Sequence, residues 1–416
     1  MIRSIVTVFL GCLLTAASAS ADPSVLHNDK PFVNPSGTAS SFSTLGDVDL
    51  TQGFFLPLGT NDRTCQTCHL PSDGWSFSAA TAQKLFNDTD GFAALFQFDG
   101  QNVDGGDLST LELRREASSL MLSKGLTRFN LELPAGAEFE IVASEGTYGN
   151  PVDATHLVVY RRPLATTNFG QLTTSLWDGR GNTIPGATTP FQILGAIFVG
   201  GTILHGEGSA PSPADADTAA ELMLSLSTAQ RVANHAGKLD LQGALGGAEN
   251  HSGDPLTGPP GFDIFDAWAT TPSPARQQIA RGQEIFNDRV FPNGGRCSGC
   301  HSVANQGNNA NGILFNIGIA AASRRTEDIP LYTLRNLSTG ETVQSSDPGL
   351  AITTGSWSDV GRFKVPTLRG LAARAPYFHN GFAEDLEAVV DFYDERFSIG
   401  LTASEKADLV AFLRAL

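Results

Sequence analysis

A five-residue motif that occurs twice constrains this chain more than any other feature. The stretches Cys65-Gln-Thr-Cys68-His69 and Cys297-Ser-Gly-Cys300-His301 both read C-x-x-C-H, which is the signal for attachment of c-type haem. In such a motif the two cysteines form thioethers with the haem vinyl groups, and the histidine faces the iron as proximal ligand. The repeat therefore predicts two covalently bound haem c groups, one on His69 and one on His301.

The remaining cysteine usage agrees with this interpretation. The chain has five cysteines, of which four belong to the motifs and the fifth is Cys12. A zinc site made of four cysteines would join two distant C-x-x-C pairs and leave both following histidines without a role. A pair of disulfides is the other alternative, and it leaves the histidines equally unexplained.

The N-terminus has the organisation of a secretory signal. Arg3 provides a positive start, residues 5–14 are apolar, and Ala19-Ser20-Ala21 is typical of a cleavage site. We therefore expect a signal peptide over residues 1–21, cleavage after Ala21 and a periplasmic protein. A lipoprotein attached through Cys12 is the competing interpretation, but it would leave almost no apolar region. No other segment reaches the roughly 18 apolar residues of a membrane span.

The formal net charge of −16 narrows the choice of partners. Strong negative charge disfavours binding to nucleic acid and to anionic membranes, and it favours a cationic or locally basic partner. The charge is also explained by the solubility of an acidic exported protein.

The sequence pattern predicts a mainly α fold with two cytochrome c-like haem domains, the first carrying a β-hairpin-containing insertion. The first domain is expected over residues 22–215, with the insertion at about 80–158. Within the insertion, alternating apolar residues on either side of a Pro/Gly turn predict a hairpin over residues 126–144, and 156–160 is a third possible strand. Residues 216–272 are expected to form a linker and a helix at 219–236.

The second domain is expected over residues 273–416. Residues 275–287 have the spacing of an amphipathic helix, and Thr402-Ala-Ser-Glu405 is a capping box that opens the last helix. Gly282, with an aromatic residue four positions later, suits a tight crossing between these two helices.

The sixth iron ligands decide what the haems do. The chain has three methionines, Met1, Met121 and Met223, and none follows His301. A thioether ligand from within the second domain is therefore excluded, although Met223 could reach it from outside. The other candidates are His379, Tyr393 and water. A phenolate is anionic and stabilises oxidised iron.

Four stretches resemble a known family. Residues 363–369 (FKVPTLR), 375–381 (APYFHNG) and 386–393 (LEAVVDFY) resemble the C-terminal region of bacterial di-haem cytochrome c peroxidases and of MauG. The motif Trp177-Asp-Gly-Arg180 resembles a motif of their first domain. The resemblance is close over 273–416, limited to motifs over 55–75 and 161–207, and absent over about 80–158.

The resemblance implies a division of labour between the haems. The haem on His69 would be the peroxidatic site, where hydrogen peroxide binds. Tyr393 matches a position that is methionine in cytochrome c peroxidases and an iron-bound tyrosine in MauG. The second haem, on His301 and Tyr393, would store or relay an electron hole. Trp177 would carry a transient radical between the two.

A peroxide site needs an acid/base group on the open face of the haem. The family uses a glutamate there, preceded by a glutamine and a proline that have no clear counterparts in this sequence. Glu207 falls near the place of the glutamate, and His205 lies two residues before it. Either is a candidate for the acid/base, and His205 could instead ligate the iron.

The family often holds Ca²⁺ between its domains through an asparagine side chain and backbone carbonyls. Arg162 takes the place of that asparagine, and a guanidinium cannot ligate a cation, so calcium is doubtful. Asn168 could substitute at a shifted register.

These observations predict a periplasmic, MauG-like oxidoreductase that uses hydrogen peroxide and oxidises a protein or a small-molecule donor. Two alternatives stay open. One is a conventional cytochrome c peroxidase that takes electrons from a small redox protein, and the other is a non-enzymatic di-haem electron carrier.

Overall fold

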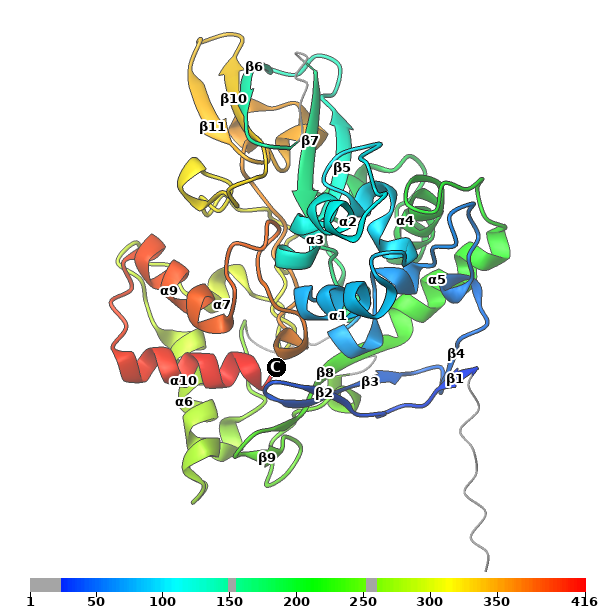
Figure 1. Cartoon of the computed structure of the whole chain (residues 1–416). Coiled ribbons are helices and arrows are strands. Elements are labelled where there is room, and N and C mark those ends of the chain that lie inside the picture. Colours follow the sequence, from blue (N-terminus) through cyan, green and yellow to red (C-terminus); the bar gives the residue numbers. More distant parts are fainter. Residues whose placement is uncertain (1–23, 149–154, 252–259) are drawn as a thin grey trace, which may run out of the picture.

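The fold combines helices with short antiparallel sheets, which connect segments that are far apart in the sequence (Figure 1). The computed structural model describes residues 24–148, 155–251 and 260–416. The expected signal peptide lies outside these residues. None of the helices in the described ranges is long and apolar enough to cross a bilayer.

The α-helices of the described chain fall into two groups. Those before the second C-x-x-C-H motif are α1 (Ala79–Thr89), α2 (Leu111–Ala117), α3 (Ser119–Lys124), α4 (Pro190–Leu204), α5 (Pro213–Ser225) and α6 (Pro274–Asp288). The others are α7 (Cys297–Cys300), α8 (Ala351–Thr354), α9 (Leu386–Phe397) and α10 (Ala403–Arg414).

The expected crossing of the first and last helices of the second domain is confirmed. The N-terminus of α10 has the capping box formed by Thr402 and Glu405. Helix α6 lies so close to α10 that a Cβ atom at Gly282 would sit 2.0 Å from the carbonyl oxygen of Asp408. The ring of Phe286 packs against that of Phe412, with centroids 5.6 Å apart.

The strands form four antiparallel sheets within the described residues. Two of these sheets are β1 (Val25–Leu26) with β4 (Val48–Asp49), and β5 (Thr127–Glu132) with β7 (His156–Arg161). The four-stranded sheet has the order β2 (Phe32–Asn34), β3 (Gly37–Ser43), β8 (Leu226–Ala233), β9 (Gly237–Lys238). The three-stranded sheet has the order β11 (Thr342–Ser345), β10 (Leu331–Asn336), β6 (Phe139–Glu145).

The predicted hairpin over residues 126–144 is wrong in its pairing. Strands β5 and β6 do form there, and β7 matches the third expected strand, but β5 pairs with β7 while β6 pairs with β10. The reason is an apolar cluster in which Phe139 and Ile141 of β6 are buried against Tyr332 and Leu334 of β10. The insertion therefore contributes a strand to a sheet with the C-terminal half.

The predicted helix over residues 219–236 is only half right. Helix α5 ends at Ser225, and the chain continues as β8, which pairs along its length with β3. Most of β8 is buried, because it lies between β3 and the C-terminal segment, where the backbone N–H of Gln230 donates to Leu416 O at 3.2 Å. The structure therefore contains more β-strand than the predicted mainly α fold. The domain boundaries remain a prediction.

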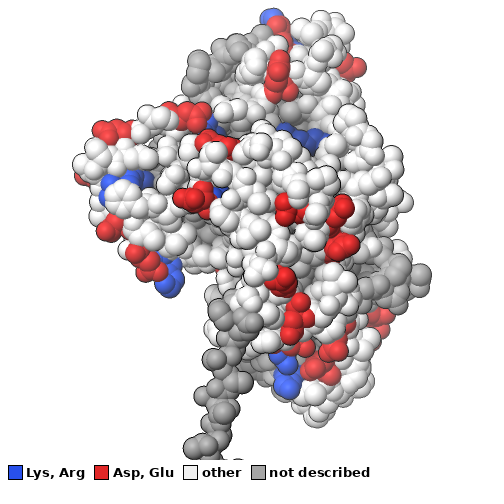
Figure 2. Space-filling model, turned by 90° about the vertical axis from the view of Figure 1, so that its right-hand side faces the viewer, with Lys and Arg blue, Asp and Glu red and all other residues white. Residues whose placement is uncertain are grey.

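Acidic side chains are spread over the face seen in Figure 2, with few basic ones between them. This distribution accompanies the net charge of −16. Such a surface attracts a cationic partner over distances of about 10 Å at moderate ionic strength.

Candidate functional site

The first C-x-x-C-H motif forms a short turn that fixes its histidine. Residues Cys65–Thr67 make a 3₁₀ helix capped by Thr64. The Nδ1 atom of His69 donates to the carbonyl oxygen of Trp75 at 3.1 Å, which leaves Nε2 for a metal. Burial, the main cause, lowers the pKa of His69 to about 4, so the imidazole is neutral, as a ligand must be.

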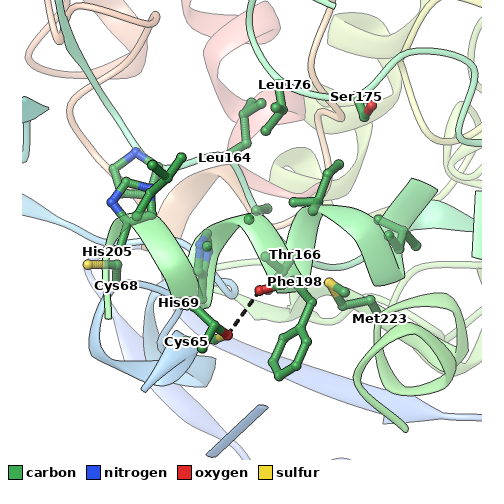
Figure 3. Close-up of a pocket in the computed structure, with 18 of the residues that line it drawn as sticks. Cys65, Cys68, His69, Leu164, Thr166, Ser175, Leu176, Phe198, His205 and Met223 are labelled. Carbon is green, nitrogen blue, oxygen red and sulfur yellow. Dashed lines mark hydrogen bonds between the residues drawn. The ribbon is translucent and has the colours of Figure 1, made fainter. Parts of the chain in front are cut away.

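A cavity of about 650 Å³ lies beside this motif and is lined by Cys65, Cys68 and His69 (Figure 3). Its lining also includes the predicted residues Trp177, His205 and Met223. Because Met223 lines this cavity and packs in the same apolar cluster as Cys65, it belongs with the first motif and not with the second.

The charges of the cavity wall fit a haem. Three buried cations line the cavity, namely Arg162, Lys364 and Arg374, and within the described residues their side chains donate to backbone carbonyls. Burial lowers the pKa of Lys364 to about 8 and those of Arg162 and Arg374 to about 10. Buried cations without carboxylate partners are costly, and the two propionates of a haem would compensate them.

The second C-x-x-C-H motif repeats this arrangement. Cys297–Cys300 form helix α7, and the Nδ1 atom of His301 donates to the carbonyl oxygen of Gly307 at 2.5 Å. Burial, the main cause, lowers the pKa of His301 to about 4. The four cysteines of the two motifs are free, as haem attachment requires.

A buried arginine, Arg369, lies beside the loop that holds His301, because the preceding residue Leu368 is hydrogen-bonded to that loop. The backbone N–H of Leu368 donates to Gln306 O at 2.9 Å, one residue before Gly307. The guanidinium of Arg369 is fully buried, and its Nε and Nη1 atoms have no hydrogen-bond partner among the described residues. A haem carboxylate beside Arg369 would accept hydrogen bonds from these two donors.

Tyr393 lies on α9 beside the second motif. It packs in the same apolar cluster as Cys297, and burial together with Cys297 and Cys300 raises the pKa of its hydroxyl. Its ring stacks on Phe397 with centroids 6.1 Å apart. The raised pKa means that a cation must displace the phenol proton, which an Fe(III) ion can do.

Trp177 lies between the two motif regions. It lines the cavity of His69 and also packs against a second apolar cluster, around Phe363 and Phe392, which Tyr393 contacts as well. Its indole Nε1 donates to the carbonyl oxygen of Arg162 at 2.7 Å, and its ring meets that of His379 edge-on with centroids 6.1 Å apart. His379 is buried and stacks on Phe363.

A buried ion network holds the Trp177 motif. Arg161 binds Asp178 through Nη1 at 2.6 Å and Asp347 through Nε at 2.6 Å and Nη2 at 2.9 Å. Arg180 also binds Asp178. Neither Arg161 nor Asp347 belongs to a motif, so no sequence pattern predicts this network.

The structure separates the two predicted distal residues. His205 is the C-cap of α4 and lines the cavity, whereas Glu207 is exposed and is not part of the cavity lining. A third residue, Asp99, lines the cavity and hydrogen-bonds to His205. Asp99 lies in the insertion, where no motif marks it, so only its spatial position reveals it.

Arg162, the residue expected in place of the calcium-binding asparagine, contacts backbone carbonyls. Arg162 donates to the carbonyl oxygens of Lys124 at 2.9 Å and Arg374 at 2.8 Å, and also to that of Phe77. The side chain of Asn168 donates to the carbonyl oxygen of Thr228 and accepts from its backbone N–H. The described residues contain no group of three acidic, histidine or cysteine side chains suited to a metal ion.

Replacing Arg162 with methionine is expected to lower stability by about 3 kcal/mol or more. Three carbonyls lose their donor, two of them in buried hydrogen bonds, and each buried unsatisfied group costs about 1–3 kcal/mol. Chemical denaturation of the holoprotein measures the loss. In the wild type a calcium chelator should leave the midpoint unchanged, because Arg162 already satisfies these carbonyls. A chelator-induced drop would contradict this role of Arg162.

Comparisons with known proteins give relatives for part of the chain. No family model matches it. It is 33% identical over 154 residues to cytochrome-c peroxidase IdrP2 of Denitromonas iodatirespirans, covering 32% of this chain and 38% of the relative. It is 43% identical over 81 residues to cytochrome-c peroxidase IdrP1 of Pseudomonas sp. (strain SCT), covering 17% of this chain and 21% of the relative.

Cytochrome c peroxidase Ccp of Escherichia coli (strain K12) is 30% identical over 155 residues, which cover 36% of this chain and 28% of the relative. The matches thus span less than half of each of these proteins. The crystal structure of a MauG-like protein associated with microbial copper homeostasis aligns over 88% of this chain and 86% of that chain, with 17% identity and a TM-score of 0.44. Over the matched segments, the chain is therefore similar to curated cytochrome c peroxidases.

Proposed function

We propose that this protein is an exported, periplasmic oxidoreductase with two covalently bound haem c groups. It uses hydrogen peroxide in a MauG-like way and oxidises a protein or a small-molecule donor. The observation that carries the proposal is the position of Trp177, which lines the cavity of His69 and packs against the apolar cluster around Phe363 and Phe392 that Tyr393 also contacts. One side chain therefore touches both expected haem environments.

The residues would divide the work as follows. His69 and His301 hold the irons, and the buried cations Arg162, Lys364 and Arg374 hold haem carboxylates. When bound, the haems supply the redox chemistry, namely the two electrons that reduce peroxide. Trp177 lies where an indole could pass oxidising equivalents from one haem environment to the other.

The resting state of the holoprotein tests the proposal. Electron paramagnetic resonance should show one high-spin ferric haem, and one equivalent of hydrogen peroxide should change the optical spectrum of both haems. Two low-spin haems that do not react with peroxide would contradict an enzymatic function and favour an electron carrier.

Tyr393 is expected to ligate the second iron. A Tyr393→Phe variant should therefore change the spectrum of that haem and raise its reduction potential, because the anionic phenolate stabilises the oxidised iron. The shift should be on the order of 100 mV, within the roughly 0.8 V range that axial ligands set. Spectroelectrochemistry measures it.

Tyr377→Phe is the matched control, since Tyr377 donates its hydroxyl to the carbonyl oxygen of Leu371 at 2.9 Å. That variant should keep the wild-type spectrum. If Tyr393→Phe also keeps it, Tyr393 is not an iron ligand.

A conventional peroxidase is the second candidate. Its support is the name cytochrome-c peroxidase shared by the curated relatives and the acidic surface, which suits a cationic electron donor. Rapid, salt-sensitive oxidation of a small basic cytochrome or cupredoxin by peroxide would favour this candidate over the MauG-like one.

A further inference from the structure

A histidine and a carboxylate meet on the wall of the cavity beside His69. His205 ends helix α4, with its backbone N–H donating to the carbonyl oxygen of Gly201 at 2.8 Å. Its Nδ1 hydrogen-bonds to the carboxylate of Asp99, and its ring meets that of Phe129 edge-on with centroids 5.4 Å apart. Figure 3 shows His205 near Cys68, with Met223 toward the opposite side of the view.

Asp99 is itself held in place by a buried arginine. Arg63 binds the other carboxylate oxygen of Asp99 and donates to the carbonyl oxygens of Ala94 at 2.9 Å and Leu95 at 3.2 Å. Burial alone would raise the pKa of Asp99, but the hydrogen bond with His205 and the charge of Arg63 outweigh it, so this pKa lies below its usual value. The carboxylate is therefore ionised and can only accept hydrogen bonds.

This arrangement sets the orientation of the imidazole. Since Asp99 can only accept, Nδ1 of His205 must carry the proton, and Nε2 remains the nitrogen that is able to exchange a proton with a molecule in the cavity. His205 and Asp99 both line that cavity, whereas Glu207 does not.

We propose that Asp99, anchored by Arg63, is a positioning residue that holds His205 as the acid/base for peroxide at the haem of His69. The proposal rests on the proposed function. Nε2 takes the proton of the inner peroxide oxygen and delivers it to the outer oxygen. With two electrons, which a haem held by His69 would supply, the O–O bond would break and the outer oxygen would leave as water, while the inner oxygen would take up two further protons to become the second water. Overall, hydrogen peroxide, two protons and two electrons give two waters, with the electrons drawn from the haem protein and replaced by the donor.

This role also gives the insertion a purpose. Asp99 lies in the 3₁₀ helix Phe98–Gly100, and Phe129 lies on β5. Both belong to the stretch over which the family resemblance is absent. The inserted segment thus supplies the carboxylate that orients the histidine from α4.

Two variants and a control test the proposal in the holoprotein. His205→Ala removes the acid/base, and Asp99→Asn keeps the shape but replaces the pure acceptor. Asp104→Asn is the control, because Asp104 lies in the same insertion, binds Arg128 with Nη1 to Oδ2 at 2.6 Å, and does not line the cavity. Circular dichroism establishes that each variant is folded.

The first readout is the rate of the optical change that peroxide causes, which needs no electron donor. It should fall about 10²- to 10⁴-fold in His205→Ala, the usual contribution of an acid/base group, and about tenfold or more in Asp99→Asn. The second is the infrared C–O stretch of the carbon monoxide adduct of the reduced protein, which responds to a hydrogen-bond donor near the bound ligand. It should shift in both variants and stay constant in Asp104→Asn.

Wild-type rates and an unshifted stretch in folded His205→Ala and Asp99→Asn would overturn the proposal. So would a change from low-spin to high-spin iron in resting His205→Ala, because His205 would then be an iron ligand. These failures differ from failure of the proposed function, in which wild-type protein itself does not react with peroxide.

Discussion

Replacing Arg161 with methionine is expected to destabilise the protein by about 3–5 kcal/mol, the usual cost of removing one partner from a buried ion pair. Asp178 and Asp347 are almost completely buried, and both depend on this guanidinium. Burial lowers the pKa of Arg161, but the two carboxylates outweigh the effect of burial, so this pKa is raised. Methionine fills similar space without the charge, so it would leave Asp347 without its cation.

Chemical denaturation of the holoprotein at pH 7 measures this loss. Arg335→Met is the matched control, since Arg335 binds Glu140 on β6 at a half-exposed site. That surface pair should contribute about 1 kcal/mol or less. Equal effects of the two variants would show that the buried network is not an important source of stability.

The network also predicts how stability depends on pH. Burial raises the pKa of Asp178, but Arg161 and Arg180 outweigh it, so the folded pKa is below the unfolded value of about 3.9. The stability that the ionised Asp178 contributes to the fold is therefore present above about pH 4 and is lost as the pH falls further. This acid-induced loss is part of the same prediction.

Replacing Gly282 with alanine is expected to cost about 3 kcal/mol, the upper end of the usual range for overpacking. The new Cβ would lie 2.0 Å from the carbonyl oxygen of Asp408 and 2.7 Å from Cβ of Phe412. Backbone cannot rotate away as a side chain can, so α6 and α10 must move apart. Because the ring centroids of Phe286 and His301 are 5.9 Å apart, the spectrum of a haem bound at His301 should change as well.

Gly195→Ala in α4 is the control for this substitution. A Cβ there would have its nearest neighbour at 3.7 Å, an ordinary contact. Alanine is a better helix former than glycine by about 1 kcal/mol, so this variant should be as stable as the wild type or more stable. A small loss in Gly282→Ala, equal to that of the control, would contradict the tight crossing.

The elements that the sequence predicts well are those whose signals are local. The capping box at Thr402 and the glycine at the helix crossing depend on a few neighbouring residues, and the structure confirms both. The C-x-x-C-H motifs likewise carry their chemistry within five residues. The orientation of each histidine is set by a hydrogen bond to a carbonyl oxygen only six residues later.

Strand pairing could not be predicted in the same way. In β8, Leu226, Ala229 and Ala233 have the spacing of a helix face, yet the strand is buried on both faces and its polar Ser227 and Thr228 are buried too. A strand buried on both faces loses the alternation that would identify it. Its partner β3 lies far earlier in the chain, beyond the reach of any local pattern.

The candidate site likewise has some residues that the sequence indicates and others that only the structure reveals. His205 was one of two alternatives in the sequence, and the structure places it in the cavity and Glu207 outside the lining. Asp99 and Arg63 carry no motif, because a hydrogen bond between distant segments leaves no spacing rule. Tyr393 as an iron ligand stays a prediction.

The pairing of β6 with β10 has a consequence for how the chain reaches its native state. Strand β6 emerges early in synthesis, but the strand that covers its edge belongs to residues 331–336. Until then a strand that carries the apolar residues Phe139 and Ile141 has unpaired backbone groups, and contacts between such distant segments form slowly. During that interval the chain is exposed to aggregation through the free edge. Production of soluble protein should therefore depend on how quickly the second half follows the first.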